Sequence, residues 1–362
     1  MSAYEYVGNL HVHTPYSDGE GFHAEVATAA QLIGLDFLVF TDHNVRLDGI
    51  EGYFGDDEQG YVLLLSGEEI HDRARHPQCN HLLVYNASQS LSPYANDLQT
   101  LINTVRKVGG FCFIAHPDDH AVRWHRDPAI PWIDRDVHGF TGLEIWNYMS
   151  RFKDHLQTRR RALQNILRPD EAMIGPHPRT LALWDQLLSM GQHVVGIGGA
   201  DAHGTRVQWG PISQTVFPYD FLFNGVNTHI LTRAPLRGNV EYDKEQLYQA
   251  LRRGRAFIGY DIPGNTRGFR FSAQGQNASV IMGESVRLGP GVTLQVLAPR
   301  RAHIKIIRHG EVMAEEHNTE NLLHVVREPG AYRAEAWLKY AGRERAWILS
   351  NPIYIEPNQP RG

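Results

Sequence analysis

Helical stripes of apolar residues alternate with short, continuously apolar runs over the first 260 residues of this 362-residue chain. Apolar side chains at three- and four-residue spacing predict a helix, and a continuous apolar run predicts a strand buried on both faces. Three such helix–strand pairs occur, at 23–33 and 36–40, at 98–105 and 111–115, and at 181–188 and 194–197. Shorter runs that predict further strands lie at 6–10, 61–65, 82–85 and 140–145. We therefore predict an α/β fold whose mostly parallel strands close, or nearly close, into a barrel.

The pattern changes after a predicted helix at 242–252 and a predicted strand at 256–260. Pro263-Gly264-Asn265 marks a boundary, and beyond it apolar and polar residues alternate over short segments with glycine turns. These segments include 293–297, 303–307, 311–313 and 322–326. Alternation with a period of two predicts strands that each bury one face, as in a β-sandwich. Arg308-His309-Gly310 is expected to close one hairpin. We predict two domains, a barrel at 1–263 and a small β-sandwich at 264–362.

Side chains that can bind metal ions follow most of the predicted strands in the first part. Of the 20 histidines, 15 lie at or before residue 203. The candidates at strand ends are His11, His13, Asp18, Asp42, His43, Glu69, His116, Asp201 and His203. Because the carboxyl ends of barrel strands meet at one face, these residues are expected to converge. A single histidine of this kind more often satisfies a local hydrogen bond, but the set as a whole favours a metal site.

Charge and cysteine usage narrow the class of protein. The net charge is −5 and no long basic run occurs, so bulk binding to nucleic acid or to a membrane surface is not expected. The sequence shows neither a signal peptide nor a long apolar span, which predicts a cytoplasmic protein. Cys79 and Cys112 form no Cys-x-x-Cys pattern, so the site is expected to use nitrogen and oxygen donors. Such donors suit zinc, manganese or iron without choosing among them.

The order of these motifs resembles that of the polymerase-and-histidinol-phosphatase (PHP) superfamily of metal-dependent phosphoesterases. The likeness covers roughly the first 260 residues and consists of His11-x-His13-Thr14-x-x-Ser17-Asp18-Gly19, Thr41-Asp42-His43-Asn44, Gly67-x-Glu69, His116-Pro117 and Asp201-x-His203. It implies a distorted seven-stranded (β/α)7 barrel, similar to a TIM barrel, with two or three metal ions.

The resemblance also implies which residues hold each ion. The first set is His11, His13, Glu69 and Asp201, the second is Glu69, His81 and His116, and the third is Asp18, His43 and His203. Glu68 adjoins Glu69, and His71 and His76 compete with His81. Such a centre would lower the pKa of a water and polarise the scissile group. We assign the catalytic roles to Asp201, His203, Glu69 and Asp42, with Asp42 orienting His43.

Three functions remain open: a phosphoesterase acting on a small phosphorylated metabolite or nucleotide, a hydrolase of a carboxylic ester or carbamate, and a non-catalytic metal-binding module. The intact motifs argue against the third. Arginines near the ligands favour phosphate, which guanidinium binds bidentately; they are Arg123, Arg126, Arg151 and Arg206. Tryptophans could instead line an apolar pocket; they are Trp124, Trp132, Trp146 and Trp209.

The second domain does not decide between a phosphate and a carbonyl substrate. Residues 264–362 resemble the C-terminal domain of the carbaryl-hydrolase-like (CehA/McbA) branch of the superfamily, which favours the carbonyl substrate. Covering the barrel or forming a homo-oligomer is the simpler role for this domain. We predict a phosphoesterase of small molecules, with carbonyl hydrolysis as the alternative. Its substrate-binding residues are expected to be Arg206, Arg151, Asn44 and His120.

Overall fold

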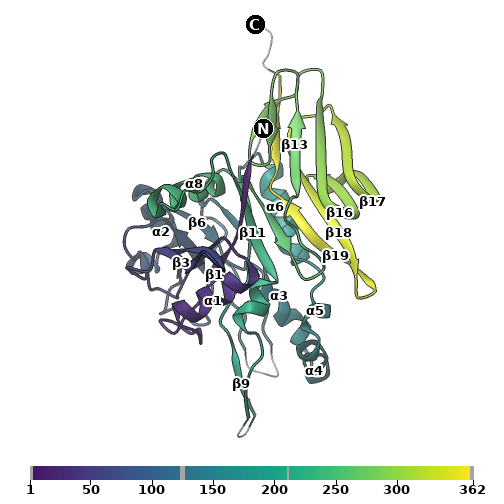
Figure 1. Ribbon diagram of the computed structural model, residues 1–362. Coiled ribbons are helices and arrows are strands. Elements are labelled where there is room, and N and C mark those ends of the chain that lie inside the picture. The colour runs from purple at the N-terminus through teal and green to yellow at the C-terminus, as the bar shows by residue number, and fades with distance from the viewer. Residues whose placement is uncertain (1–2, 123–126, 210–211, 359–362) are drawn as a thin grey trace.

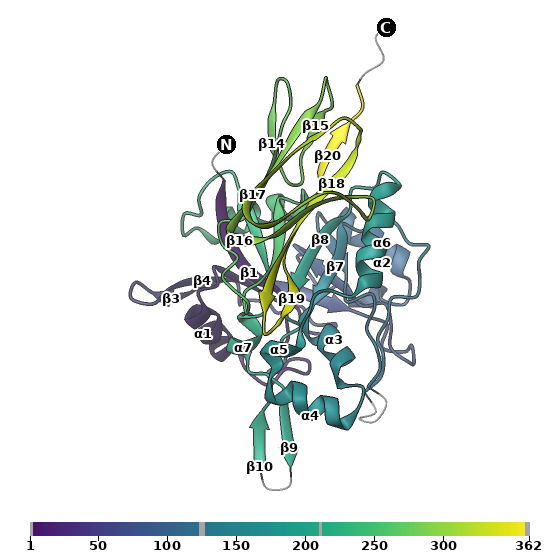
Figure 2. The same ribbon diagram turned by 90° about the vertical axis from the view of Figure 1, so that its right-hand side faces the viewer.

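A computed structural model of the chain describes residues 3–122, 127–209 and 212–358. Figures 1 and 2 show a rounded body made of the helices and the earlier strands, with a tall sheet of the later strands rising from it. The protein is therefore a mixed α/β protein, as predicted. Helices α1, α2 and α6 confirm the three predicted helices, and each predicted strand of the first part is present.

Seven strands of the body follow one another around a ring. Parallel pairing joins β1 to β2, β2 to β4, β6 to β7 and β7 to β8, whereas β5 is antiparallel to both β4 and β6. A parallel bridge between Val12 and Ala202 brings the segment after β8 back to the end of β1. The parallel strands thus end at one rim. The bounds are β1 Tyr4–Val12, β2 Phe37–Phe40, β4 Gly60–Ile70, β5 Leu82–Tyr85, β6 Phe111–Ile114, β7 Gly142–Asn147 and β8 Val195–Gly199.

The predicted helices bury the apolar stripes that predicted them. In α2 the buried residues are Leu98, Leu101, Ile102 and Val105. Helix α1 ends at Gly34, whose φ of 81° is a left-handed conformation that glycine adopts without a side-chain penalty. The bounds are α1 His23–Ile33, α2 Leu98–Lys107, α6 Pro178–Ser189 and α8 Val240–Arg252.

Several elements were not predicted. Helices α3 and α7 bury apolar side chains but are too short to show a period in the sequence. Helix α4 buries Ala162 and exposes most of its other side chains. The antiparallel hairpin of β9 and β10 projects from the body (Figures 1 and 2). These elements are β3 Gly52–Asp56, α3 Tyr148–Lys153, α4 Arg159–Leu167, α5 Pro169–Ala172, β9 Arg206–Trp209, β10 Ile212–Thr215 and α7 Tyr219–Phe223.

The sheet continues from the body into the C-terminal strands. Strand β11 pairs antiparallel with β1 and β12, and β12 pairs antiparallel with β19. A second buried apolar cluster lies mainly among the C-terminal strands and includes Phe271, Val296, Ile304 and Trp347, together with Leu231 of β11 and Phe257 of β12. The bounds are β11 Val226–Thr232, β12 Ala256–Tyr260, β13 Arg270–Gln274, β14 Ser279–Ile281, β15 Ser285–Arg287, β16 Val292–Arg308, β17 Glu311–Val326, β18 Gly330–Tyr340, β19 Arg343–Ser350 and β20 Ile353–Glu356.

Buried polar contacts fasten the C-terminal strands to the body. The guanidinium of Arg333 in β18 donates to both carboxylate oxygens of Asp185 in α6, at 2.8 and 2.7 Å. The Asn351 side chain accepts from the Gly196 amide at 2.7 Å and donates to the Ala256 carbonyl at 2.9 Å. Since an unpaired buried polar group costs about 1–3 kcal/mol, these contacts favour one relative placement of the two parts.

Two pairs of predicted strands are in fact single long strands. The segments 293–297 and 303–307 both belong to β16, and the segments 311–313 and 322–326 both belong to β17. The ladder between β16 and β17 shifts register between Leu297 and Ala302, which interrupts the alternation in the sequence. The predicted turn is confirmed: His309 and Gly310 have φ values of 53° and 79°, as a type I′ hairpin turn requires.

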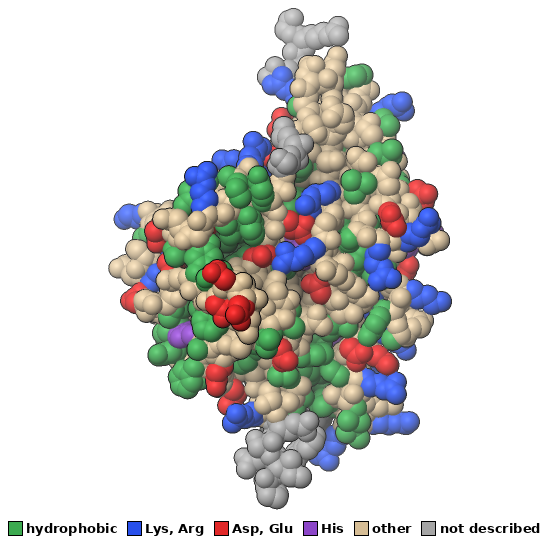
Figure 3. Space-filling view, in the orientation of Figure 1, with side chains coloured by type: hydrophobic (Ala, Val, Ile, Leu, Met, Phe, Trp, Pro, Cys, Tyr) green, Lys and Arg blue, Asp and Glu red, His purple; other side chains and the backbone are tan. Residues whose placement is uncertain are grey.

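Three further features concern the helices, the surface and the cysteines. Within the described residues, no helix is both long and apolar enough to cross a bilayer. On the face drawn in Figure 3, basic and acidic side chains are interspersed, and histidine is visible in only one small area. Cys79 and Cys112 are free and buried.

Glu5 provides a test of how β1 is held. One carboxylate oxygen lies 2.8 Å from His229 Nδ1 in β11, and the other accepts from the Gly268 amide at 3.0 Å. Burial opposes the charge, but His229 and Arg270 outweigh it and lower the pKa of Glu5 from 4.5 to about 2. A carboxyl group with a lowered pKa stabilises the fold above its unfolded pKa and loses that contribution as pH falls toward its folded value. The shift corresponds to about 3 kcal/mol at neutral pH.

We therefore expect Glu5→Gln to lower the free energy of unfolding by up to about 3 kcal/mol at pH 7, and by less than half of that at pH 3. Urea denaturation at both pH values measures the difference. Exposed Glu320 serves as the control, because Glu320→Gln removes a carboxylate outside this contact. A Glu5→Gln effect that is the same at both pH values would show that the carboxylate charge is not what stabilises the contact.

Candidate metal centre

The candidate ligands gather at the rim where the parallel strands end. His11 lies near the end of β1, His13 and His43 follow β1 and β2, and Glu69 is next to the last residue of β4. His116, Asp201 and His203 follow β6 and β8. His81 precedes β5, and because β5 runs antiparallel, its beginning lies at this same rim. The reversed strand thus explains how a histidine that opens its strand joins residues that end theirs.

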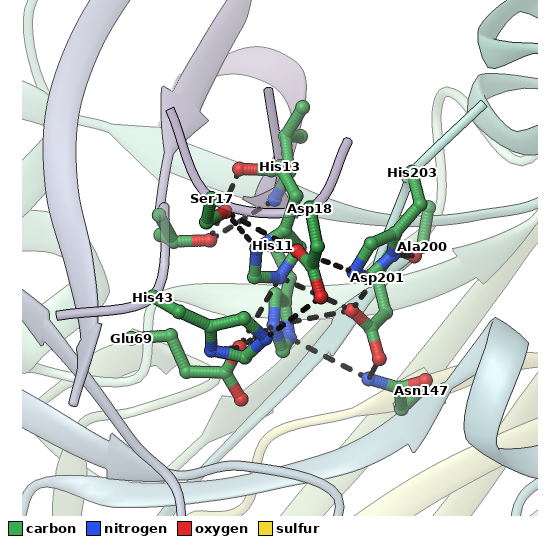
Figure 4. Close-up of polar contacts among 12 residues, drawn as sticks. His11, His13, Ser17, Asp18, His43, Glu69, Asn147, Ala200, Asp201 and His203 are labelled. Atoms are coloured by element: carbon green, nitrogen blue, oxygen red, sulfur yellow. Dashed lines mark hydrogen bonds and ion pairs between the residues drawn. The ribbon is translucent and has the colours of Figure 1, made fainter. Parts of the chain in front are cut away.

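The buried carboxylate of Glu69 contacts more of these histidines than any other residue described, and Figure 4 shows Glu69 beside His43. Its Oε2 lies 3.0 Å from His11 Nε2, 3.1 Å from His13 Nε2 and 3.2 Å from His43 Nδ1. Its Oε1 lies 2.8 Å from His81 Nδ1 and 3.0 Å from His116 Nε2. One carboxylate therefore contacts five imidazoles, with its two oxygens facing different sets.

Two aspartates complete the arrangement on the more exposed side. Asp201 Oδ1 lies 3.4 Å from His11 Nε2 and 3.2 Å from His13 Nε2. Asp18 Oδ1 lies 3.2 Å from His203 Nε2, and its Oδ2 lies 3.5 Å from His43 Nε2. The Asp18 side chain is 53% exposed, so the centre opens to solvent at this residue.

The structure brings together the ligand sets that the resemblance implies. His11, His13, Glu69 and Asp201 offer donor atoms that all lie within 4.8 Å of one another, and Asp18, His43 and His203 form a second such group together with His13. Glu69 and His81 form a third group with His43, while His116 contacts the same Glu69 oxygen as His81. Among the alternatives, Glu68 bonds Ser90 and Leu91 rather than a histidine, and the ring of buried His71 stacks on that of His81.

Electrostatics keeps the central carboxylates ionised. Burial opposes the charge of Glu69, but His11, His43 and His81 outweigh it and hold the pKa of its carboxyl well below the usual range. Burial likewise opposes the charge of Asp201, whose pKa the surrounding histidines hold well below the usual range. Burial lowers the pKa of His81 to about 3. Burial opposes the charge of His11, His43, His116 and His203, but the neighbouring carboxylates outweigh it and raise the pKa of each of these rings. Because a ligating imidazole is neutral, metal binding would release protons from these histidines.

Three residues at this rim have a strained backbone. Asn44, His116 and Asp201 have φ values of 55°, 25° and 54°, in the left-handed region that side chains disfavour. The His116 amide donates to Glu144 Oε2 at 3.0 Å, which compensates the strain with a buried hydrogen bond. Such conformations cost about 1–3 kcal/mol each and are found most often at functional sites.

Sequence reasoning missed three residues that hold the ligands. Glu144 Oε1 lies 3.0 Å from His11 Nδ1, so Glu144 can orient the ring with Nε2 toward Glu69. Asn147 donates to Asp201 Oδ2 at 3.2 Å. The Tyr219 hydroxyl bonds the carbonyls of both His13 and His203, at 2.9 and 3.0 Å. A carboxylate inside the apolar run 140–145 was the available signal for Glu144.

Asp42 has a different contact from the one predicted. Its carboxylate accepts from the Thr14 amide and hydroxyl, both at 2.8 Å, and from the Ser17 hydroxyl at 2.6 Å. It therefore stabilises the turn that carries Asp18, rather than the ring of His43. The prediction was wrong about the partner because the turn after β1 folds back over Asp42.

The predicted substrate-binding residues are dispersed. Arg151 is held by Asp154 and by the Gly175 carbonyl. Arg206 is exposed at the start of β9. His120 Nδ1 lies 2.5 Å from Asp154 Oδ1, and its ring contacts that of His177. Asn44 lies beside His43 and accepts from the His71 amide at 3.1 Å.

Two of the four tryptophans can be placed. Trp146 is fully buried against Tyr260, and Trp132 is largely buried. Trp146 packs in the core, whereas Trp132 lines a cavity of about 410 Å³ beside α6. Trp124, Arg123 and Arg126, together with the Trp209 side chain, lie outside the described residues.

The chemistry of the donor set fits metal ions. His13 Nε2 and His43 Nδ1 lie 3.1 and 3.2 Å from Glu69 Oε2, yet within the described structure neither makes a hydrogen bond. At these two positions an imidazole nitrogen approaches a carboxylate oxygen without a hydrogen bond, whereas His11, His81 and His116 are each hydrogen-bonded to Glu69. An array of buried donors of this kind is costly unless a cation binds it. Nitrogen and oxygen donors without thiolate suit zinc, manganese or iron.

Glu144 offers a test of how the ligands are oriented. We expect Glu144→Gln to weaken metal affinity by about 10–100-fold, because removing an outer partner of a ligating histidine has this effect. Metal content after dialysis against graded chelator measures it. The control is Glu51→Gln, which removes a carboxylate paired with Lys244 away from the centre. Equal metal retention in both variants would contradict the orienting role.

No family model matches the sequence, and no curated protein sequence matches it. Among solved structures, the chain is similar to a two-domain protein from Bacteroides vulgatus ATCC 8482 that contains a predicted PHP-like metal-dependent phosphoesterase. The two chains are 16% identical, and the match covers 97% of this chain and 95% of the other with a TM-score of 0.47. The chain resembles the PHP superfamily in its motifs, and the structure brings the residues of those motifs together. Similarity to the carbaryl-hydrolase-like branch stays a prediction.

Proposed function

We propose that this protein is a metal-dependent phosphoesterase that hydrolyses small phosphorylated molecules. The observation that supports it is the contact of Glu69 with five imidazoles, four of which belong to the three donor groups described above. Because these groups share Glu69, His13 and His43, ions bound in them would be close neighbours. Neighbouring ions suit phosphoryl transfer, in which both the attacking and the leaving oxygen carry charge.

The proposed mechanism assigns separate tasks to the chain's own residues. Bound ions would supply Lewis acidity and lower the pKa of a water. Glu69 and Asp201 would hold these ions, while Glu144 and Asn147 fix His11 and Asp201 in position. Asp42 and Tyr219 keep the segments that carry Asp18, His13 and His203 from moving. Rigid placement of this kind lowers the barrier because no reorganisation is needed during the reaction.

The proposal takes residues 1–263 as a distorted barrel that carries the centre, and residues 264–362 as a β-sandwich. The ring of strand pairings supports the first part, and the apolar cluster that consists mainly of residues from 264–362 supports the second. The contacts of Arg333 and Asn351 support a stabilising role for the second part.

The donor groups lead to an expected metal content. Protein purified without chelator should contain two or three transition-metal ions per chain, because the donor atoms suffice for three sites that share residues. Elemental analysis measures this content. In Glu69→Gln the metal content should fall to about one ion per chain or fewer, because Glu69 belongs to more than one donor group. A wild-type content below one ion would contradict the assignment.

The class of substrate is tested with four chromogenic compounds and the metal-loaded protein. We expect turnover of p-nitrophenyl phosphate or bis-p-nitrophenyl phosphate, and little turnover of p-nitrophenyl acetate or a naphthyl carbamate. His13→Ala and Asp201→Ala should each reduce the rate by a factor of about 10³ or more, since both remove donor atoms of the centre. Their melting temperatures, measured in chelator, should match that of the wild type.

Two results would contradict this proposal. Metal-dependent turnover of the acetate or carbamate alone would assign the protein to carbonyl hydrolysis. Near-normal phosphatase rates in His13→Ala with full metal content would show that His13 is not part of the reacting centre.

A further inference from the structure

We infer that a pocket beside His43 is a second binding subsite, which recognises an oxyanion carried by the substrate away from its scissile group. This inference adds to the proposed function, and it rests on that function because the scissile group is taken to bind at the metal centre. The pocket has a volume of about 390 Å³ and lies next to the metal centre; it is lined by Asn44, His71, Asp72, Arg73, Ala74, Ser92, Pro93, Ala95 and Asn96.

Two residues on the inner wall of this pocket have buried polar atoms without a hydrogen-bond partner in the described structure. Asn44 is 9% exposed and His71 is 5% exposed. Within the described structure, Asn44 Nδ2 and His71 Nδ1 have no hydrogen-bond partner. A buried amide or imidazole without a partner costs about 1–3 kcal/mol, so such groups are rare unless a ligand or water completes them. Both residues adjoin the centre, because Asn44 follows His43 and the His71 ring stacks on that of His81.

An exposed guanidinium at the edge of the pocket supplies positive charge. Arg73 donates to the His43 carbonyl at 3.3 Å through one of its five N–H groups, which places this cation beside a candidate metal ligand. Asp72 is the carboxylate of the pocket, and its Oδ1 accepts from the Ala74 amide at 2.9 Å. A guanidinium, an amide and an imidazole favour a ligand rich in acceptor oxygens, such as a carboxylate or phosphate.

The opposite wall is held by a residue that the metal centre leaves unused. Glu68 accepts from the Ser90 hydroxyl at 2.6 Å and from the Leu91 amide at 3.1 Å, and is itself buried. These contacts fix the start of the segment that contributes Ser92 and Asn96. The pocket is therefore built by buried polar contacts and does not depend on surface side chains alone.

The subsite predicts a preference among ligands that share one phosphonate group. Isothermal titration of the metal-loaded full chain would compare phenylphosphonate with its 3- and 4-carboxyphenyl analogues, whose P–C bonds resist hydrolysis. The wild type should bind at least one carboxylated ligand about tenfold or more tightly than the parent, as expected for a charge-assisted hydrogen bond. Arg73→Gln should reduce this preference to less than about twofold and leave affinity for the parent unchanged.

Arg135→Gln is the matched control, because Arg135 is an exposed arginine that lines a different cavity, of about 410 Å³, beside α6. It should retain the wild-type preference. The corresponding phenyl phosphates should show the same pattern in KM, with kcat unchanged in Arg73→Gln.

The outcomes separate the subsite from the proposed function. Equal binding of all three ligands by the wild type, or an unchanged preference in Arg73→Gln, would overturn the subsite even if phosphate esters are hydrolysed. A preference that depends on Arg73, without hydrolysis of any phosphate ester, would support the subsite and contradict the proposed reaction. Loss of the preference in Arg135→Gln alone would place the subsite in the other cavity.

Discussion

The negative charge of Glu69 is the constraint on which the centre depends. A carboxylate in the protein interior loses its hydration, which costs several kcal/mol unless surrounding groups compensate. Here the compensation comes from five imidazoles that reach one residue from four separate strands or their flanking segments. Each of these histidines is in turn held by backbone or side-chain contacts, so their placement and the ionisation of Glu69 depend on each other.

The direction of one strand determines whether these imidazoles can meet. In a ring of wholly parallel strands, a residue that precedes a strand lies at the opposite rim from the residues that follow the others. Strand β5 runs antiparallel to β4 and β6, so His81 lies beside His116, which follows β6. The irregularity in the ring is therefore a requirement of the centre, since both histidines contact the same oxygen of Glu69.

The sequence predicted those elements and site residues that depend on the local pattern of apolar and polar residues. Apolar periodicity located α1, α2 and α6, and polar residues just after apolar runs located most of the clustered donors. It was uninformative about α4, which buries little apolar surface, and about the long strands β16 and β17, whose register shift breaks the alternation. The partners of Asp42 and Arg151 could not be predicted either, because the direction of a side chain depends on how the neighbouring turn folds.

Glu68 and Glu69 are adjacent, yet they face opposite sides of β4, as successive residues of a strand must. One of them holds the histidines, and the other holds the segment after Ser90. The register of a single strand thus sets both the ion-binding centre and the wall of the neighbouring pocket. A slip of one residue would exchange the two carboxylates and abolish both at once. Variation in substrate preference within such a scaffold is therefore expected to arise by changes in residues 90–96, while the pairing of β4 stays fixed.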